Sequence, residues 1–321
     1  MVPNLRHFVS YFAASAIALA VSLAAAHADY PEKPIEFIIP FGAGGGADIE
    51  GRLLATEMGN VLGVNLIPIN KVGGGGAVAY THTKNAAPDG YTVVWNSTSI
   101  LTTTNIGNVD FGYDALDHVG RVEWQPMPFA VSGDSRWDTF EEFVAECREN
   151  PGSLKVSNSG SGSATHLGAI ALMDAAGCEV THLPVGISRR NATVLSGEAD
   201  AMIAPLTGAV NLTKAGKLKL LVMPSGVRNP VMPDVPTARE LGFDVALDLF
   251  RGLSVPKGTP DDVKAKLANA MAEAAQSAEF MDLAMQKGFT VDPLDSAAFG
   301  EILEVDDAMI KSILENADLG G

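Results

Sequence analysis

Short apolar runs alternate with helical stretches along nearly the whole chain, and this alternation restricts the possible folds more than any other feature. Nine runs have the length of a strand and are bounded by Gly, Pro, Asn or Asp: residues 35–40, 65–69, 91–95, 128–132, 154–157, 179–183, 201–204, 218–223 and 249–255. Strand–helix–strand alternation predicts an α/β fold with parallel sheets and right-handed crossovers.

The length of the chain, 321 residues, is too great for one small domain and suits two lobes with a cleft between them. We expect lobe one to comprise residues 29–126 and 248–321, and lobe two residues 127–247. The chain would leave lobe one, build lobe two and return. A hydrophobic fraction of 47% predicts a sizeable core.

The N-terminus has the pattern of a signal peptide over residues 1–28. Arg6 and His7 form a weak basic head, residues 11–26 are apolar, and Ala26-His27-Ala28 matches an A-x-A cleavage site. A membrane anchor is the alternative, but the apolar run is short for one. The sequence therefore predicts a protein exported to the periplasm.

The chain is strongly acidic, with a formal charge of −16. Cleavage after residue 28 would remove one arginine and no acidic residue, which leaves 21 basic against 38 acidic residues, or −17. The negative electrostatic potential of such a chain repels phosphate groups, so nucleic acid and anionic membranes are poor partners. We expect a monomer without a cofactor.

Cysteine and histidine usage points away from metal and redox chemistry. Cys147 and Cys178 are too few for a disulfide framework, but an exported chain can pair them, and we expect the bond within lobe two. The four histidines after residue 28 lack metal-ligand spacing, so no metal site is predicted.

A glycine-rich loop, residues 40–48, follows the first strand and opens a helix. Gly42, Gly44 and Ala47 match the G-x-G-x-x-A pattern of dinucleotide sites. That function also needs an acidic residue at the end of the next strand, where this chain has Asn70-Lys71 instead. Exposed amides at a helix start remain a good anion site.

A second loop, residues 157–166, also lies between a predicted strand and a helix and is rich in serine and glycine. Its hydroxyls and amides predict an uncharged cradle for an anion. An exported hydrolase using Ser161 or Ser163 with His166 is an alternative, although no serine lies in a G-x-S-x-G pattern. Ser97 and Thr98 follow another strand. The glycines of residues 73–76 are interpreted as a tight turn.

These segments together resemble the tripartite tricarboxylate transporter receptors, also called the Bug family of periplasmic binding proteins. The resemblance rests on Tyr30-Pro31-x-Lys33-Pro34-Ile35, Pro40-Phe41-x-x-Gly44-Gly45-x-x-Asp48-x-x-x-Arg52, Ala86-Ala87-Pro88-Asp89-Gly90-Tyr91-Thr92, Pro233-Asp234-Val235-Pro236-Thr237 with Gly242-Phe243, and Val255-Pro256-x-Gly258-Thr259-Pro260. The chain departs from the family pattern at Ala43, Ala47, the shortened Pro184-Val185-Gly186 and Arg251.

The resemblance implies a periplasmic binding protein fold, with two α/β lobes that close on a carboxylate, and delivery of that ligand to two membrane subunits of a transporter. It implies a binder and not an enzyme. We expect the ligand site to include Phe41, Gly42, Ala43, Gly44, Asp48, Ser97, Thr98, Asn158, Ser161, Gly162, Ser163, Thr165, His166, Arg190, Pro205 and Arg251.

We expect the ligand to be a dicarboxylate of four to six carbons. The two loops offer neutral donors for one carboxylate, and a second buried carboxylate needs a cation. Arg251, or the pair Arg189-Arg190, would supply it. The alternatives are an aromatic carboxylate as ligand, a structural ion pair for Arg251, and a solvated arginine pair.

Overall fold

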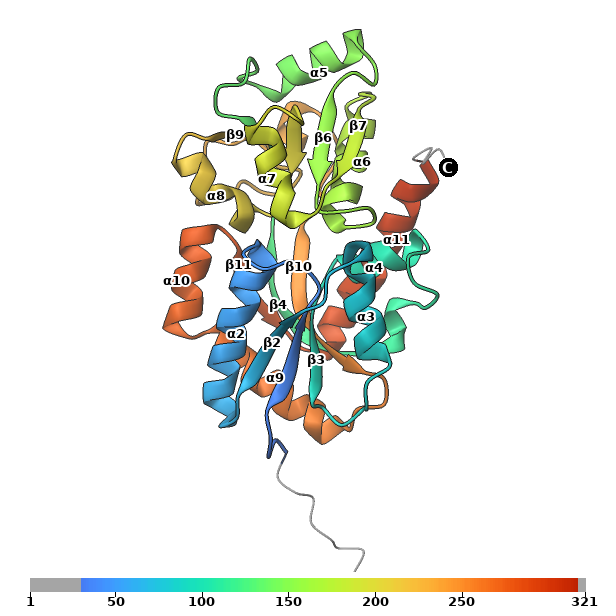
Figure 1. The fold of residues 1–321 in the computed structure, drawn as a ribbon, viewed down its shortest axis with the longest axis vertical. Helices are drawn as coiled ribbons and strands as arrows, with labels where there is room; N and C mark the ends of the chain where they lie inside the picture. Colours follow the sequence, from blue (N-terminus) through green and yellow to red (C-terminus); the bar gives the residue numbers. More distant parts are fainter. Residues whose placement is uncertain (1–29, 317–321) are drawn as a thin grey trace, which may run out of the picture. The chain divides into compact units, whose positions relative to one another are not determined.

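The computed structural model describes residues 30–316, so the expected signal peptide lies outside the described residues. Pro34 begins a compact unit that holds all the strands and helices described below. Figure 1 shows two sheets in this unit, each flanked by helices, and we call each sheet with its helices a lobe.

Lobe one contains a six-stranded sheet in the order β11-β4-β10-β3-β1-β2. Its strands are β1 (Ile35–Ile39), β2 (Leu66–Asn70), β3 (Thr92–Ser97), β4 (Leu116–Gln125), β10 (Leu249–Pro256) and β11 (Thr290–Leu294). Its helices are α2 (Gly46–Leu62), α3 (Ala77–Lys84), α4 (Ser99–Asn105), α9 (Asp261–Ala275), α10 (Ala278–Lys287) and α11 (Ser296–Asn316), with short turns η1 (Gly74–Gly76) and η2 (Tyr113–Ala115).

Lobe two contains a five-stranded sheet in the order β7-β6-β8-β5-β9. Its strands are β5 (Phe129–Ser132), β6 (Lys155–Asn158), β7 (Thr181–Pro184), β8 (Ala201–Ile203) and β9 (Leu218–Val222). Its helices are α5 (Phe140–Glu149), α6 (Ala164–Ala175), α7 (Ile187–Leu195) and α8 (Leu206–Lys214), and a short turn η3 (Arg239–Leu241) lies on the return to lobe one.

All nine expected strands are confirmed to within two residues at each end, but the expectation of purely parallel sheets is wrong. β10 is antiparallel to both β3 and β4, and β5 is antiparallel to both β8 and β9. β11 is also antiparallel to β4, whereas β5 and β10 each follow a passage of the chain between the lobes. The α/β class itself is confirmed.

The helix boundaries follow from local chemistry. Pro260 precedes α9, whose first turn carries Asp261 and Asp262, where the helix dipole favours negative charge. Its apolar residues Val263, Leu267, Ala270, Met271 and Ala274 lie on one face and are buried. A capping box formed by Thr139 and Glu142 begins α5.

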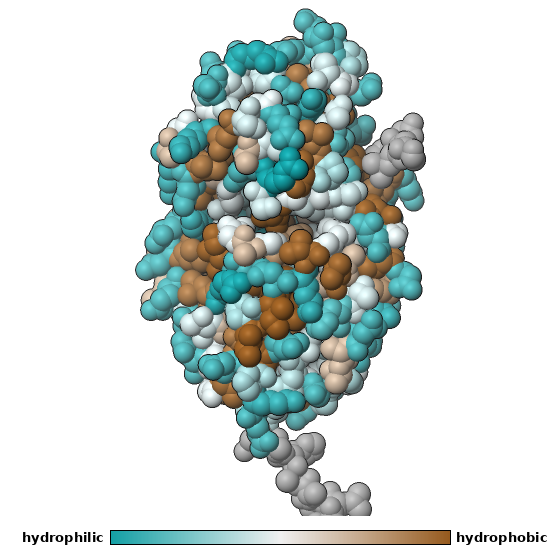
Figure 2. All heavy atoms as spheres, in the orientation of Figure 1, coloured by the Kyte–Doolittle hydropathy of each residue, from teal (hydrophilic) through white to brown (hydrophobic). Residues whose placement is uncertain are grey.

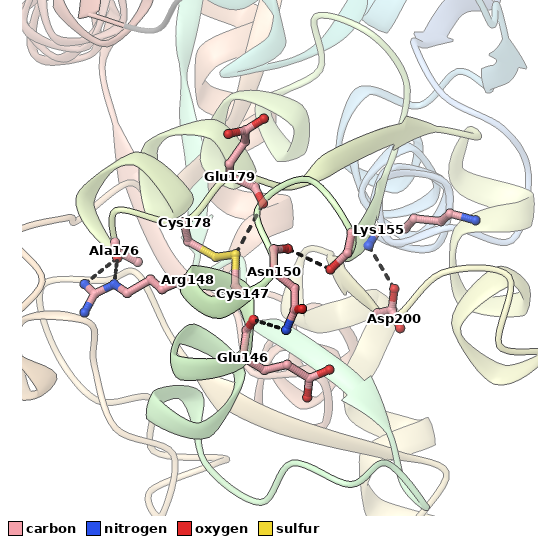
Figure 3. The surroundings of a disulfide bond; sticks show 10 residues. Glu146, Cys147, Arg148, Asn150, Lys155, Ala176, Cys178, Glu179 and Asp200 are labelled. Carbon is pink, nitrogen blue, oxygen red and sulfur yellow. Dashed lines mark hydrogen bonds between the residues drawn. A yellow bond between two sulfur atoms is a disulfide. The ribbon is translucent and has the colours of Figure 1, made fainter.

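A disulfide joins Cys147, near the end of α5, to Cys178, which follows α6, with the two Cα atoms 5.7 Å apart (Figure 3). The expected pairing within lobe two is therefore confirmed. Beside it, Arg148 Nε donates to the Ala176 carbonyl over 2.9 Å (Figure 3). The bond thus fastens the end of α5 to the turn that follows α6.

The two passages between the lobes lie next to each other. β4 ends at Gln125 and β10 begins at Leu249, and these two residues face each other in the antiparallel ladder. All strands of lobe two fall between them in sequence. The two chain segments that connect the lobes therefore run side by side at this junction.

Candidate ligand-binding site

The first predicted loop, between β1 and α2, is shaped by the carboxylate of Asp48. Asp48 Oδ2 accepts from Gly44 N (2.9 Å), and Oδ1 accepts from Arg52 Nε (2.7 Å) and Asn70 Nδ2 (2.9 Å). Asn70 Nδ2 also donates to the Phe41 carbonyl (2.8 Å). Burial alone would raise the pKa of Asp48, but these hydrogen bonds and the charge of Arg52 lower it below 3.8.

This arrangement assigns Asp48 a structural task, because its oxygens already accept hydrogen bonds from the loop, from α2 and from the end of β2. Gly44 has a φ of +78°, a left-handed conformation that glycine adopts without strain. Ala43 and Gly44 are exposed and Gly42 is half-buried, so the backbone of the loop is the part presented to a ligand.

The second predicted loop, between β6 and α6, is held by its own side chains. Ser163 is the N-cap of α6 and its Oγ accepts from His166 N (3.2 Å). Thr165 Oγ1 accepts from Ser159 N (2.9 Å). Asn158 Oδ1 accepts from Gly160 N (3.0 Å), whereas its buried Nδ2 has no hydrogen-bond partner.

The second loop touches lobe one on one side. Thr102 Oγ1, at α4, donates to the Gly162 carbonyl, and Asn108 Nδ2 donates to the Ser161 carbonyl (3.4 Å). A Cβ on Gly75 would lie 2.9 Å from the Ser161 carbonyl oxygen. The glycine turn of residues 73–76 therefore allows the backbones of the two lobes to come close together, in addition to turning the chain.

The first loop touches lobe two on the other side. A Cβ on Gly45 would lie 2.5 Å from Ile187 Cγ2 at the start of α7, and one on Gly46 would lie 3.2 Å from Thr207 Cβ at the start of α8. Each predicted loop thus contacts the opposite lobe in this structure. Ile187 and Thr207 were not among the expected site residues, and only their place after a strand could have indicated them.

The starts of α7 and α8 bring further polar groups to this boundary. Pro205 occupies the N-cap position of α8, and Thr207 N donates to Gln125 Oε1 (3.2 Å). Thr207 Oγ1 is buried without a hydrogen-bond partner. Arg190, in α7, is 2% exposed and donates to Ser159 Oγ over 2.6 Å. Thr207 thus lies against the first loop, and Arg190 binds the second.

Arg251, expected to hold a second carboxylate, lies in a buried ion-pair cluster, and its buried Nη1 has no hydrogen-bond partner. Its Nε binds Glu50 and lies 3.4 Å from Glu123 Oε1, and both acids are 0% exposed. Burial, and then the neighbouring Glu50, raise the pKa of Glu123 well above its usual range. Gln125 Nε2 donates to Glu50 Oε1 (2.9 Å). The structural ion pair is the alternative that fits.

Ser97 and Thr98 are fully buried at the end of β3. Ser97 Oγ accepts from Ser99 N (3.2 Å), and Thr98 Oγ1 accepts from Phe250 N (3.0 Å). Both hydroxyls therefore hold β3 to the start of α4 and to β10. The structure places them at the strand end as expected, with their hydrogen bonds directed to the protein.

A cavity of about 450 Å³ lies beside the second loop, between α4 and α11 of lobe one and α6 and β7 of lobe two. Its apolar wall is formed by Ile106, Leu167, Ile170 and Leu314, and its polar wall by Thr102, Asn108, Ser161, Gly162, His166 and His182. The lining residues include no acidic residue, lysine or arginine.

The two histidines of this cavity are held neutral. Their ring centroids are 5.3 Å apart in an edge-to-face arrangement. Burial, and then the neighbouring His166, lower the pKa of His182 to about 4, and burial lowers the pKa of His166. His166 Nδ1 accepts from Gly162 N (3.3 Å), so the backbone and not a serine hydroxyl occupies this nitrogen.

Residues 30–316 lack both a metal cluster and a membrane-spanning helix. Within that range, no three His, Cys, Asp or Glu side chains are grouped so that they could hold a metal ion. None of the helices there combines the length and the hydropathy of a membrane-spanning segment.

The face of the molecule shown in Figure 2 is largely hydrophilic, with hydrophobic patches near its middle.

A two-lobed α/β unit in which helix-start loops meet across the lobes defines the class of periplasmic solute-binding proteins. A family model described as "Tripartite tricarboxylate transporter family receptor" matches residues 51–319, and the chain belongs to this family. The family and the fold are those of substrate-binding proteins and not of enzymes. The resemblance in the sequence is thereby confirmed.

Individual relatives agree with this assignment. The chain is 30% identical to a UPF0065 protein of Bordetella pertussis over 277 residues, 85% of this chain and 86% of that protein. It matches a TctC solute-binding protein from Polaromonas, described without ligand, at 32% identity and a TM-score of 0.69, covering 89% and 99% of the two chains. MatC from Rhodopseudomonas palustris, described with bound malate, matches at 25% identity and a TM-score of 0.84, covering 88% and 99%.

Proposed function

We propose that this chain captures a small organic acid between its two lobes in the periplasm and delivers it to the membrane subunits of a tripartite tricarboxylate-type transporter. The observation that carries the proposal is the meeting of helix-start loops from opposite lobes around buried donors without partners, Asn158 Nδ2 and Thr207 Oγ1. Buried polar groups are rarely left without a hydrogen bond, so a ligand or ordered water is expected there.

Helix polarity favours an anion as this ligand. α2 and α6 begin at the two loops, and α8 begins at Pro205 beside Thr207. The N-terminus of a helix presents free amides and a partial positive charge. Three such ends from two lobes would stabilise a carboxylate without a positively charged side chain in the loops themselves.

The described arrangement supports lobe closure as the capture mechanism. Both loops contact the opposite lobe, through Gly75 and Ser161 on one side and through Gly45 and Ile187 on the other. The TM-score is also higher for the malate-bound MatC than for the unliganded Polaromonas protein, although the latter is more similar in sequence. A ligand that touches both lobes would shift the population toward this state.

For the ligand we propose a dicarboxylate of four to six carbons, in line with the malate of MatC. A second candidate is an aromatic monocarboxylate. It is favoured by the cavity beside the second loop, whose apolar wall and neutral histidines suit an uncharged ring.

We further propose lobe boundaries at residues 126/127 and 247/248, near the two passages between the lobes. We also propose that the receptor is a monomer and that residues 1–28 direct its export.

A thermal-shift panel of mono-, di- and tricarboxylates with aromatic acids tests the proposal. A ligand at 100 times its Kd adds about 2.7 kcal/mol to the free energy of unfolding, which gives a measurable rise in Tm. Calorimetry on the binder then uses Thr207→Val, which removes only a hydroxyl without a partner. We expect weaker binding with the apo Tm unchanged or raised.

The matched control is Thr213→Val on the same helix, whose Oγ1 bonds the Ala209 carbonyl (3.2 Å). It should leave affinity unchanged. No stabilisation by any acid of the panel would overturn the proposed function. Equal affinity of the Thr207→Val variant and the wild type would show that the ligand lies elsewhere.

A further inference from the structure

Arg190 differs from the other charged side chains that the described part of the chain buries. Asp48 pairs with Arg52, Glu50 and Glu123 with Arg251, and Asp307 with Lys311. Arg190 is buried to 2% exposure and has no aspartate or glutamate partner within residues 30–316. A buried charge without an opposite charge is strongly unfavourable.

The hydrogen bonds of Arg190 are all to neutral groups. Nη1 donates to Ser159 Oγ (2.6 Å) and Nε to Asn191 Oδ1 (3.4 Å). No acceptor of the described chain takes a hydrogen bond from Nη2. A Cβ on Gly208 would lie 3.0 Å from Nη2, so a side chain at this position would press against the guanidinium.

The surroundings of the guanidinium add positive potential. Arg190 lies in the first turns of α7, which begins after Gly186, and its Nη2 faces the first turn of α8. Helix N-terminal ends carry partial positive charge. Burial lowers the pKa of Arg190 to about 10, so the group is still charged at neutral pH.

Arg190 contacts the second binding loop and lies beside the helix start that meets the first. Ser159, which accepts its hydrogen bond, belongs to the second loop. Thr207, adjacent to Gly208, contacts Gly46 of the first loop. The guanidinium therefore binds the second loop directly through Ser159. It is linked to the first loop through Gly208 and its neighbour Thr207.

Neither of the other candidate arginines is free to take this role. Arg251 Nε binds Glu50 and lies 3.4 Å from Glu123 Oε1, so this cation already has an acidic partner, although its buried Nη1 has no hydrogen-bond partner. The side chain of Arg189 is 62% exposed and pairs with Glu198 at 3.2 Å. The two neighbours in sequence thus have opposite environments, because consecutive positions on α7 point about 100° apart around the helix.

We propose that Arg190 is the counter-ion of one carboxylate of the bound acid and the residue that selects ligands with two negative groups. The first carboxylate binds the loop amides, and the second approaches Nη2 of Arg190 beside Gly208. This inference rests on the proposed function and names the substrate class of the same site.

The test is calorimetry with malate, succinate and adipate, together with succinamate, in which an amide replaces one carboxylate of succinate. Arg190→Met should weaken binding of the preferred diacid by about 10- to 100-fold, the range for a hydrogen bond to a charged group. Binding of succinamate should change little. Arg190→Lys should recover part of the loss, and Arg189→Met, the matched control, should bind as the wild type does.

A second readout needs no ligand. If the buried cation lacks a partner until an anion arrives, Arg190→Met should raise the apo Tm. A merely structural arginine predicts the reverse, because Ser159 would lose its donor. A fall in apo Tm, or equal loss for diacid and monoamide, would overturn the inference while the proposed function stands. Failure of the wild type to bind any of these acids, or any acid of the wider panel, would overturn the function itself.

Discussion

At the scale of single residues, the site depends on side chains that never need to touch the ligand. Asp48 gathers Gly44, Arg52 and Asn70 around one carboxylate and so fixes the backbone of the first loop. The amides of that loop can bind an anion only if their directions are set before the ligand arrives. Preorganisation of this kind lowers the entropic cost of binding.

Asp48→Asn should therefore destabilise the protein and weaken ligand binding. We expect a loss of about 1–3 kcal/mol in the free energy of unfolding at pH 7. The pKa of Asp48 is lowered in the folded state, so its contribution is present above the unfolded pKa and is lost as the pH falls through the folded value. In urea titrations the difference between variant and wild type should shrink below about pH 4.

Glu57→Gln on the same helix is the control, since this half-buried acid bonds only the exposed Asn60, at 3.5 Å. It should change stability by less than about 0.5 kcal/mol. A difference for Asp48→Asn that stays constant down to about pH 3 would contradict the assigned role of its charge.

Arg251 marks a limit of sequence reasoning at this scale. Its apolar strand and its place at a passage between the lobes suggested a side chain directed at the ligand. Its partner Glu50 is 201 residues away in sequence, and nothing in the local pattern indicates that the two meet. A buried charge can be recognised in a sequence, but its counter-ion depends on tertiary packing.

At the scale of elements, the sequence was informative wherever local physics decides the structure. Runs of apolar residues between turn formers located nine strands, and the loops of residues 40–48 and 157–166 were placed correctly between a strand and a helix. β4 and β11 were missed because Asp117, Arg121 and Glu123 interrupt the first, and Asp292-Pro293 the second. These strands are specified by their neighbours in the sheet more than by their own hydropathy.

The disulfide also acts at the scale of elements, since it joins the end of α5 to the turn after α6 (Figure 3). Cys147→Ser with Cys178→Ser should lower the free energy of unfolding by about 2–4 kcal/mol, because the bond closes a loop of 31 residues in the unfolded chain. The bond is formed by residues outside the two binding loops, so affinity measured well below the new Tm should be unchanged.

The measurement compares urea unfolding of the oxidised protein, the reduced protein and the double variant. Reduced wild type should behave like the variant. Equal stability of all three forms would contradict the prediction, and a loss of affinity in the variant would show that the crosslink reaches the binding site.

At the scale of the whole molecule, closure depends on glycines that leave room for the opposite lobe. Gly45→Ala places a Cβ 2.5 Å from Ile187 Cγ2, a contact that exists only when the lobes meet. Because φ at Gly45 is −81°, alanine is not strained there. We expect an unchanged apo Tm and affinity weaker by about tenfold, which corresponds to about 1.4 kcal/mol.

Gly226→Ala provides the matched control outside both binding loops, since Gly226 is exposed and no atom lies within 4 Å of the added Cβ. Small-angle scattering should show ligand-induced compaction in this control and in the wild type, and less of it in Gly45→Ala. Identical affinity and compaction in all three proteins would mean that the contact between Gly45 and Ile187 is not part of the ligand-bound state.

The pairing of Gln125 with Leu249 has a consequence for how such a protein can change over generations. Seen from lobe one, everything from residue 126 to residue 248 is an insertion at the tip of a single hairpin. Its two ends are neighbours, and both cysteines of the crosslink lie inside it. Such an inserted segment can be exchanged between relatives as one stretch of a gene. The exchange would bring the second loop of the ligand site with it and leave the strand order of the lobe-one sheet unchanged.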